Sequence, residues 1–279
     1  MSALITPTEL HERRRREDLT VLDVQFTLDG RGPALYADGH LASAPFVDLD
    51  AVLAGPAGAG GRHPLPDPDV LQAGLRAAGV ADGATVVVYD QATSLSAARA
   101  WWVLRWAGLT DVLVLDGGLQ AWRAAGFEVV TDPVQPRPGD VTVRPASLPV
   151  LDADAAAGMA ARGRLVDARA AERFRGETEP IDPVAGHVPG AVNVPMSDLT
   201  SDEGSLRPPE ELRARFAEAG VTPGTEVGAY CGSGVTAAHS ALALHEIGIE
   251  AAVYVGSWSH WVTDPARPVA TGPDVSPGW

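Results

Sequence analysis

The sequence predicts an α/β protein made of two similar domains, each a mainly parallel sheet flanked by helices. Three observations lead to this prediction. The chain has 279 residues, more than one typical domain. A long stretch of its first half recurs in its second half. Within both copies, short apolar runs alternate with longer helical patterns, which is typical of right-handed βαβ units with parallel strands.

The internal repeat defines the domain boundaries. Asp90 aligns with Cys231, 141 positions later. Trp122 aligns with Trp261, 139 positions later. A nearly constant offset over such a length indicates that one domain is duplicated within the chain. We therefore predict a first domain over residues 1–130 and a second over 151–279. The proline-rich residues 131–150 lack a helical period and are predicted to be the linker.

The apolar pattern of each copy assigns its central elements. A continuous apolar run predicts a strand that is buried on both faces. The chain opens with a capping-box pattern, Thr6 to Glu9, that predicts a helix start. Residues 55–61 are rich in glycine but lack the spacing of a nucleotide loop, so we expect a flexible loop. The other expected elements are strands at 84–90, 111–116, 226–230 and 251–255, and helices at 96–107 and 236–247.

Composition excludes several classes of function. The net charge of −15 argues against non-specific binding to nucleic acid or to acidic membranes. No apolar run is long enough to span a membrane, and the start of the sequence lacks the apolar core of a signal peptide. With one cysteine, the chain can form no internal disulfide. We expect a cytoplasmic protein in a reducing compartment.

Cys231 stands in the loop of residues 231–236, between a predicted buried strand and a helix N-terminus. Open α/β sheets bind ligands at this edge. Gly232 and Gly234 allow the loop to turn its amides inward, and such amides form a cradle for an anion. A cysteine at this cradle is held as a reactive thiolate. The alternative is a cysteine buried as a small apolar residue.

The residues after Cys231 exclude one class of cysteine-dependent reaction. Cysteine phosphatases need an arginine six residues after the nucleophile, and that position is Ala237 here. The remaining chemistry is attack on sulfur, which converts the thiolate to a persulfide. No histidine, including His245 and His260, has the spacing of a metal ligand with a second ligand, so we expect no metal.

The loop "CGSGVT" occurs together with "GHVPGAVNVP", "VDARAAERFRGE" and "GSWSHW". In this combination nearly the whole chain resembles the rhodanese family of tandem-domain sulfurtransferases. The resemblance implies two rhodanese-like domains, a persulfide on Cys231 and no cofactor. It also implies that the N-terminal domain, with Asp90 in the cysteine position, is silent in transfer. The neutral "CGSG" form resembles the branch that uses 3-mercaptopyruvate.

The resemblance also implies the residues that bind substrate. Arg173 matches the family arginine that binds the anion of the donor, and Gly232, Gly234, Val235 and Thr236 belong to the binding loop. The 3-mercaptopyruvate enzymes usually carry a second arginine a few residues later, within an "EPR" sequence. In this chain Ile181 follows Glu179 and Pro180, so that arginine is missing. Arg175 is a candidate to replace it.

A Ser–His–Asp relay has been suggested for the 3-mercaptopyruvate branch. By motif match it falls on Ser233, His63 and Asp50. The relay would polarise the thiol or carbonyl of the substrate while Cys231 attacks. The alternative is a histidine in a surface loop and an aspartate at a strand end, each with no role in the reaction.

These observations predict a sulfurtransferase that takes sulfur from a small anionic donor, 3-mercaptopyruvate in the first place. Because the chain has no second cysteine, an external thiol (thioredoxin-like or of low molecular weight) or cyanide must accept the sulfur. One alternative is a thiosulfate:cyanide sulfurtransferase, which the missing arginine favours. The other is a non-catalytic sulfur-carrier or binding module, which a deeply buried thiol would favour.

Overall fold

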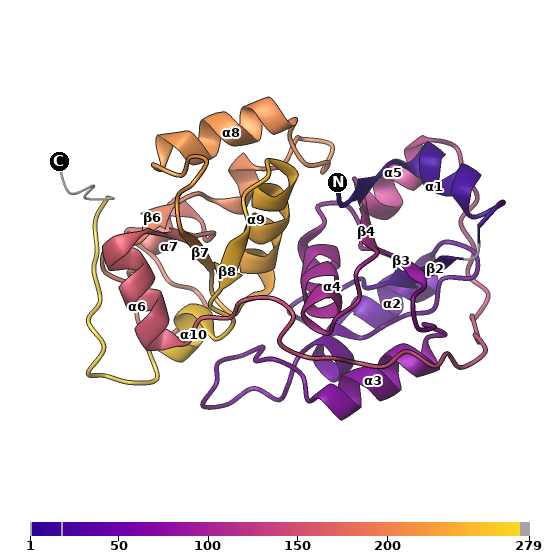
Figure 1. Ribbon diagram of the computed structural model, residues 1–279, viewed down its shortest axis with the longest axis horizontal. Helices are drawn as coiled ribbons and strands as arrows, with labels where there is room; N and C mark the ends of the chain where they lie inside the picture. Colours follow the sequence, from indigo (N-terminus) through magenta and orange to yellow (C-terminus); the bar gives the residue numbers. More distant parts are fainter. Residues whose placement is uncertain (1, 18, 274–279) are drawn as a thin grey trace. The chain divides into compact units, whose positions relative to one another are not determined.

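The computed structural model describes residues 2–17 and 19–273 of the chain (Figure 1). The predicted outer ends of the two domains, residues 1 and 279, lie outside these ranges. The chain forms two compact units, each with its own sheet. The first comprises Met1–Gly55, Leu65–Leu148 and Asp202–Leu206, and the second comprises Pro56–Pro64, Pro149–Ser201 and Arg207–Trp279.

The first unit contains a four-stranded parallel sheet in the order β1-β4-β3-β2. Parallel strands need helical crossovers, and the helices of this unit provide them. The strands are β1 Leu4–Ile5, β2 Leu19–Asp23, β3 Thr85–Tyr89 and β4 Val112–Leu115. The helices are α1 Pro7–Arg13, α2 Gly32–Asp38, α3 Pro68–Ala77, α4 Leu95–Trp106 and α5 Gly118–Ala124, with a π-helical turn at Leu49–Leu53.

The second unit repeats this architecture with a four-stranded parallel sheet in the order β6-β5-β7-β8. Its strands are β5 Arg164–Asp167, β6 Val192–Asn193, β7 Val227–Tyr230 and β8 Ala251–Val253. Its helices are α6 Ala153–Arg162, α7 Ala171–Phe174, α8 Pro209–Glu218, α9 Val235–Glu246 and α10 Ser257–Trp261, with a 3₁₀ turn at Met196–Asp198. The predicted fold class, two α/β domains with mainly parallel sheets, is confirmed.

The predicted elements agree with the observed ones to within two residues at each end. The strand expected at 84–90 is β3, and its last four residues are buried, as its apolar run indicates. The first helix begins at the predicted capping box, where the amide of Glu9 donates to the Thr6 hydroxyl at 3.2 Å. Residues 131–148, predicted as linker, belong to the first unit, where Val141 is buried and its amide donates to the Val80 carbonyl.

Both copies hold a corresponding loop through the tyrosine at the end of a central strand, β3 or β7. The Tyr89 hydroxyl accepts the amide of Leu41 at 2.9 Å, and the Tyr230 hydroxyl accepts the amide of Val188 at 3.1 Å. Beside these tyrosines, His187 Nδ1 lies 2.8 Å from the Phe174 carbonyl, and His40 likewise contacts a main-chain carbonyl. Both histidines therefore hold the turns in which they lie through main-chain contacts.

The two copies differ in how they satisfy a buried aspartate at a strand end. Asp167 is paired with Arg169, whereas Asp23 is bonded to the uncharged side chain of Gln25, with 2.9 Å between Nε2 and the carboxylate. Without a cation beside it, burial raises the pKa of Asp23 from 3.8 to about 6, despite the hydrogen bonds from Tyr89 and Gln25.

This buried carboxyl group makes the stability of the protein depend on pH. Because the pKa of Asp23 is about 6 in the folded protein and 3.8 in the unfolded chain, its contribution is present below about pH 4 and is lost as the pH rises through 6. Between about pH 4 and pH 6 we expect the free energy of unfolding of wild type to fall by roughly 2–3 kcal/mol. The Asp23→Asn variant should not show this fall, because its side chain does not ionise. Denaturant unfolding at several pH values measures this difference. Asp202→Asn, at an exposed position, is the control and should follow wild type.

Candidate active site

The Cys231 loop connects β7 to α9 at the carboxyl edge of the second sheet. Helix α9 begins at Val235, one residue earlier than predicted, so the loop has four residues, Cys231 to Gly234. The early start depends on Gly234, whose φ is +85°, a conformation that favours glycine. A Cβ at this position would also lie 2.3 Å from the Val255 carbonyl oxygen. Glycine is therefore required at residue 234 on both grounds.

The sulfur of Cys231 lies among hydrogen-bond donors. The amides of Ser233 and Gly234 point at Sγ, with distances of 3.4 and 3.1 Å from their nitrogens. The Cys231 amide in turn donates to the Ser257 hydroxyl at 3.1 Å, and its carbonyl accepts the amide of Trp258. Cys231 is only 2% exposed, and the amides directed at Sγ form a cradle of the kind that holds an anion.

The other predicted loop residues follow Cys231 directly or lie at the start of α9. Val235 and Thr236 form the first turn of α9, where main-chain amides have no partner within the helix. Gly232 faces two guanidinium groups, because a Cβ there would lie 3.6 Å from Arg173 Nη2 and 2.9 Å from Arg62 Nη2. The loop itself carries no cationic side chain, as the sequence indicates, and the two cations beside it come from outside its residues.

Ser233 is in contact with His63. The Ser233 hydroxyl lies 2.8 Å from His63 Nδ1, and both side chains are buried. His63 reaches the loop because residues 56–64 belong to the second unit, although the first sheet and its helices lie on both sides of them in the sequence. The predicted flexible loop of residues 55–61 leads into this packed segment. The structure thus brings together two of the three predicted relay residues.

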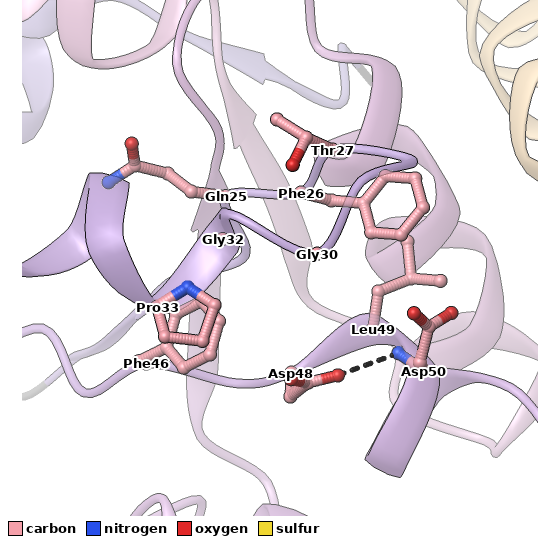
Figure 2. A pocket seen from close by; sticks show the side chains of 10 residues that line it. All are labelled: Gln25, Phe26, Thr27, Gly30, Gly32, Pro33, Phe46, Asp48, Leu49 and Asp50. Carbon is pink, nitrogen blue, oxygen red and sulfur yellow. Dashed lines mark hydrogen bonds between the residues drawn. The ribbon is translucent and has the colours of Figure 1, made fainter.

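Asp50, the third predicted relay residue, belongs to the first unit. Figure 2 shows it on the wall of a small pocket of that unit, where its amide donates to the Asp48 carboxylate at 2.9 Å. Burial raises the pKa of the Asp50 carboxyl, and the charge of Asp48 raises it further. Its part in the relay stays a prediction.

Arg173 lies at the end of α7 and is held by acidic residues. Its Nη2 and Nε lie 2.6 and 3.1 Å from the carboxylate of Glu179, and Nη2 lies 3.3 Å from Asp182. Burial by itself raises the pKa of Glu179, but the bonds from Arg173 and from main-chain amides outweigh it and lower the pKa. Arg175, the candidate replacement for the missing arginine, instead pairs with Glu177 at 2.7 Å.

Arg169 connects this acidic cluster to the sulfur loop. It is fully buried, with Nη2 2.6 Å from Asp167 and 2.7 Å from the Gly186 carbonyl. Its guanidinium carbon lies 4.7 Å from the centroid of the Trp258 ring, and the amide of Trp258 binds the Cys231 carbonyl. Burial alone lowers the pKa of a guanidinium, but the charge of Asp167 keeps the pKa of Arg169 above its ordinary value. Asp167 and Arg169 therefore form a buried ion pair.

Comparison with known protein families identifies the family to which this fold belongs. The model of the rhodanese-like domain matches the chain twice, over residues 6–125 and 152–264. The chain belongs to the rhodanese family. Its closely similar relatives carry the names of sulfurtransferases, and this rhodanese-family protein is an enzyme of that class.

Individual relatives differ in the donor that their names give. A Pseudomonas aeruginosa protein with the provisional name 3-mercaptopyruvate sulfurtransferase is 47% identical, over 96% of this chain and 98% of its own length. A Mycobacterium tuberculosis protein with the provisional name thiosulfate sulfurtransferase SseB is 46% identical, over 96% and 97%. The crystal structure of Escherichia coli SseA, described as a 3-mercaptopyruvate sulfotransferase with the rhodanese fold, superposes with a TM-score of 0.82 at 30% identity, over 93% and 100%.

The first rhodanese domain fills its own loop with a carboxylate. Asp90, at the position of Cys231, is buried and accepts the amides of Ser94 and Ser96 at 3.1 and 3.0 Å, together with those of Ala92 and Ala97. Burial raises the pKa of Asp90, and these amide bonds offset part of the rise. The amides that could hold an external anion are therefore engaged within the protein.

Two residues of the second rhodanese domain were missed by sequence reasoning, Ser257 and Arg62. Ser257, whose hydroxyl accepts the Cys231 amide, has a φ of +55°. Its counterpart in the first copy is Gly118, 139 positions earlier, with a φ of +56°. The signal available in the sequence was a serine at the position where the first copy has a glycine. Arg62 adjoins the predicted His63, but no motif indicates that it reaches Gly232.

Among the described residues, no helix combines the length and the apolar character needed to cross a membrane.

Proposed function

We propose that this enzyme transfers sulfur from 3-mercaptopyruvate, through a persulfide on Cys231, to an external acceptor. The Cys231 thiolate attacks the sulfur of the donor and an S–S bond forms. The C–S bond breaks, its electron pair goes to the carbon of the pyruvate enolate, and the proton of the donor thiol ends on the methyl group of pyruvate. The amides around Sγ suit an anionic persulfide, because they supply hydrogen bonds without adding bulk.

The contact between Ser233 and His63 is the observation that carries the donor assignment. The hydroxyl lies two residues from the nucleophile and 2.8 Å from an imidazole nitrogen. A hydroxyl held in this way can bond to the thiol or carbonyl group of 3-mercaptopyruvate and polarise it while the C–S bond breaks. Thiosulfate has neither group. Asp50 is the sequence-based candidate for the carboxylate that fixes the imidazole.

The anion of the donor requires a cation near the loop, and Arg173 is proposed to supply it. Its guanidinium adjoins Gly232, and its planar group can bind a carboxylate through two hydrogen bonds. Gly232 and Gly234 leave room for the donor, and the amides of Val235 and Thr236 add the positive end of the α9 dipole.

Thiosulfate is the second candidate donor. Two observations favour it: Ile181 stands in place of the second family arginine, and a close relative carries the name of a thiosulfate sulfurtransferase. In this case sulfite leaves as the S–S bond of thiosulfate breaks and a new one forms on Cys231.

The acceptor is proposed to be an external thiol, thioredoxin-like or of low molecular weight, or cyanide. The chain contains no second cysteine that could resolve the persulfide, so an outside nucleophile must remove the sulfur and regenerate the thiolate. A single free thiol suits the reducing cytoplasm, where we place the reaction. The first domain is proposed to be silent in transfer, because Asp90 replaces the nucleophile and occupies the amides of its loop.

A comparison of both donors, using wild type and Ser233→Ala, tests this function. We expect wild type to have the higher kcat/KM with 3-mercaptopyruvate. Because the hydroxyl acts on groups that only this donor has, Ser233→Ala should reduce its kcat/KM roughly 10²-fold and leave thiosulfate turnover within about threefold. Equal or greater wild-type efficiency with thiosulfate would overturn the donor assignment. Equal effects of the substitution on both donors would remove the role of Ser233.

A further inference from the structure

A second guanidinium group lies against the sulfur loop from a part of the chain that motif matching does not include. A Cβ at position 232 would lie 2.9 Å from Arg62 Nη2 and 3.6 and 3.8 Å from the two terminal nitrogens of Arg173. Two cationic side chains therefore converge on one point beside Gly232, and the glycine keeps that point free of side-chain atoms.

The main chain holds Arg62 in register with this loop. The Arg62 amide donates to the Ser259 hydroxyl at 3.1 Å, and the Ser259 amide donates to the Gly232 carbonyl at 2.9 Å. The preceding Gly61 has a φ of +103° and packs against the Gly256 carbonyl, where a Cβ would lie at 2.7 Å. Arg62 is thus fixed to the same α10 segment that holds Cys231, and is not a freely moving surface residue.

One buried carboxylate orients both arginines. Asp182 forms an ion pair with Arg62 Nη1 through one oxygen and with Arg173 Nη2 through the other. The Asp182 side chain is 3% exposed, whereas the side chains of Arg62 and Arg173 are 27% and 16% exposed. The carboxylate therefore lies behind the two guanidiniums, which retain contact with solvent.

Arg62 keeps donors that this ion pair does not use. The ion pair with Asp182 uses Nη1, whereas Nη2 is the Arg62 atom that lies nearest to Gly232. The Nε of Arg62 is buried and has no hydrogen-bond partner in the described part of the chain. A buried guanidinium nitrogen without a partner costs free energy, which an incoming anion can recover.

We propose that Arg62 binds the carboxylate of the donor together with Arg173, and so supplies the second anion-binding arginine that Ile181 cannot provide. This proposal rests on the proposed function. A guanidinium on the 56–64 segment reaches the same loop from another direction, and Asp182 holds it in place in the free enzyme. The loop has no cationic side chain of its own, and the tertiary structure brings the guanidinium of Arg62 to it.

The test measures binding by calorimetry in the Cys231→Ser background, where no transfer takes place. The ligands are 3-mercaptopyruvate and its methyl ester, which lacks the carboxylate charge. Adding Arg62→Gln should weaken binding of the acid roughly 10- to 100-fold, the effect of losing one charge-assisted hydrogen bond. Binding of the ester should change by less than about threefold, since it cannot use that bond. Arg62→Lys should restore part of the affinity for the acid.

Arg162→Gln is the matched control, because Arg162 belongs to the same unit but pairs with Glu226 at an exposed position. It should leave both affinities unchanged, and thermal melting confirms that each variant is folded. An acid affinity that survives Arg62→Gln, or an equal loss for acid and ester, overturns the role of Arg62. If the Cys231→Ser protein with Arg62 intact binds acid no better than ester, the proposed donor fails instead.

Discussion

Cys231→Ser is expected to reduce sulfur transfer to the uncatalysed background with either donor. Serine preserves the size of the side chain, and its hydroxyl can accept the amides of Ser233 and Gly234, so the loop should keep its shape. An alkoxide is not accessible near neutral pH, and the persulfide requires a thiolate to form. Steady-state assays with both donors measure the loss.

Mass spectrometry identifies the intermediate in the same experiment. Wild type treated with donor in the absence of acceptor should gain the mass of one sulfur atom on the peptide that contains Cys231, and the variant should gain none. Turnover that persists in a folded Cys231→Ser protein would contradict both the nucleophile and the persulfide. An unchanged thermal melting curve shows that the variant is folded.

Arg169→Gln is expected to destabilise the second domain by about 3–5 kcal/mol, because it leaves the carboxylate of Asp167 buried without its cation. Glutamine is the residue at the equivalent position of the first copy, Gln25, so the repeat shows that its side chain fits this site. The contact with Trp258 is lost as well, and through it the support of the Cys231 carbonyl. Denaturant unfolding measures the stability, and kcat/KM of the folded fraction measures the effect on the loop.

The double variant Asp167→Asn/Arg169→Gln is the control for this mechanism. It removes the charge that the single variant leaves unpaired, so it should recover a large part of the lost stability. A double variant that is no more stable than Arg169→Gln would show that packing of the guanidinium, and not charge compensation, dominates the effect. Such a result would contradict the electrostatic explanation.

Much of the fold could be predicted because its pattern is local. The apolar run that forms β3 is continuous because helices cover both faces of the sheet, and the run alone predicts that burial. The internal repeat allowed each element to be predicted from two segments of the chain. Asp90 and Cys231 align and each follows a predicted strand, so Cys231 was expected at the carboxyl edge of its sheet. Positions of helix ends were less exact, since the start of α9 depends on the backbone angle of Gly234.

The candidate site was predicted in part. Ser233 and His63 were paired by motif match, and the structure brings them to 2.8 Å. The loop carries no cationic side chain, but a motif confined to residues 231–236 could not indicate that Arg62 lies beside it. Arg62 precedes Gly232 by 170 positions in the sequence, yet its guanidinium lies beside that glycine in the structure.

The sequence by itself determined the duplicated α/β architecture, the place of the one cysteine between a buried strand and a helix, and the exclusion of a phosphatase by Ala237. These features depend on residues within one element or on the repeat. Only tertiary structure decided which charges surround the sulfur. Segment 56–64 packs with the second unit, and Asp182 orients both arginines at Gly232. Electrostatic fields act through space, so residues distant in sequence set the charge at the site.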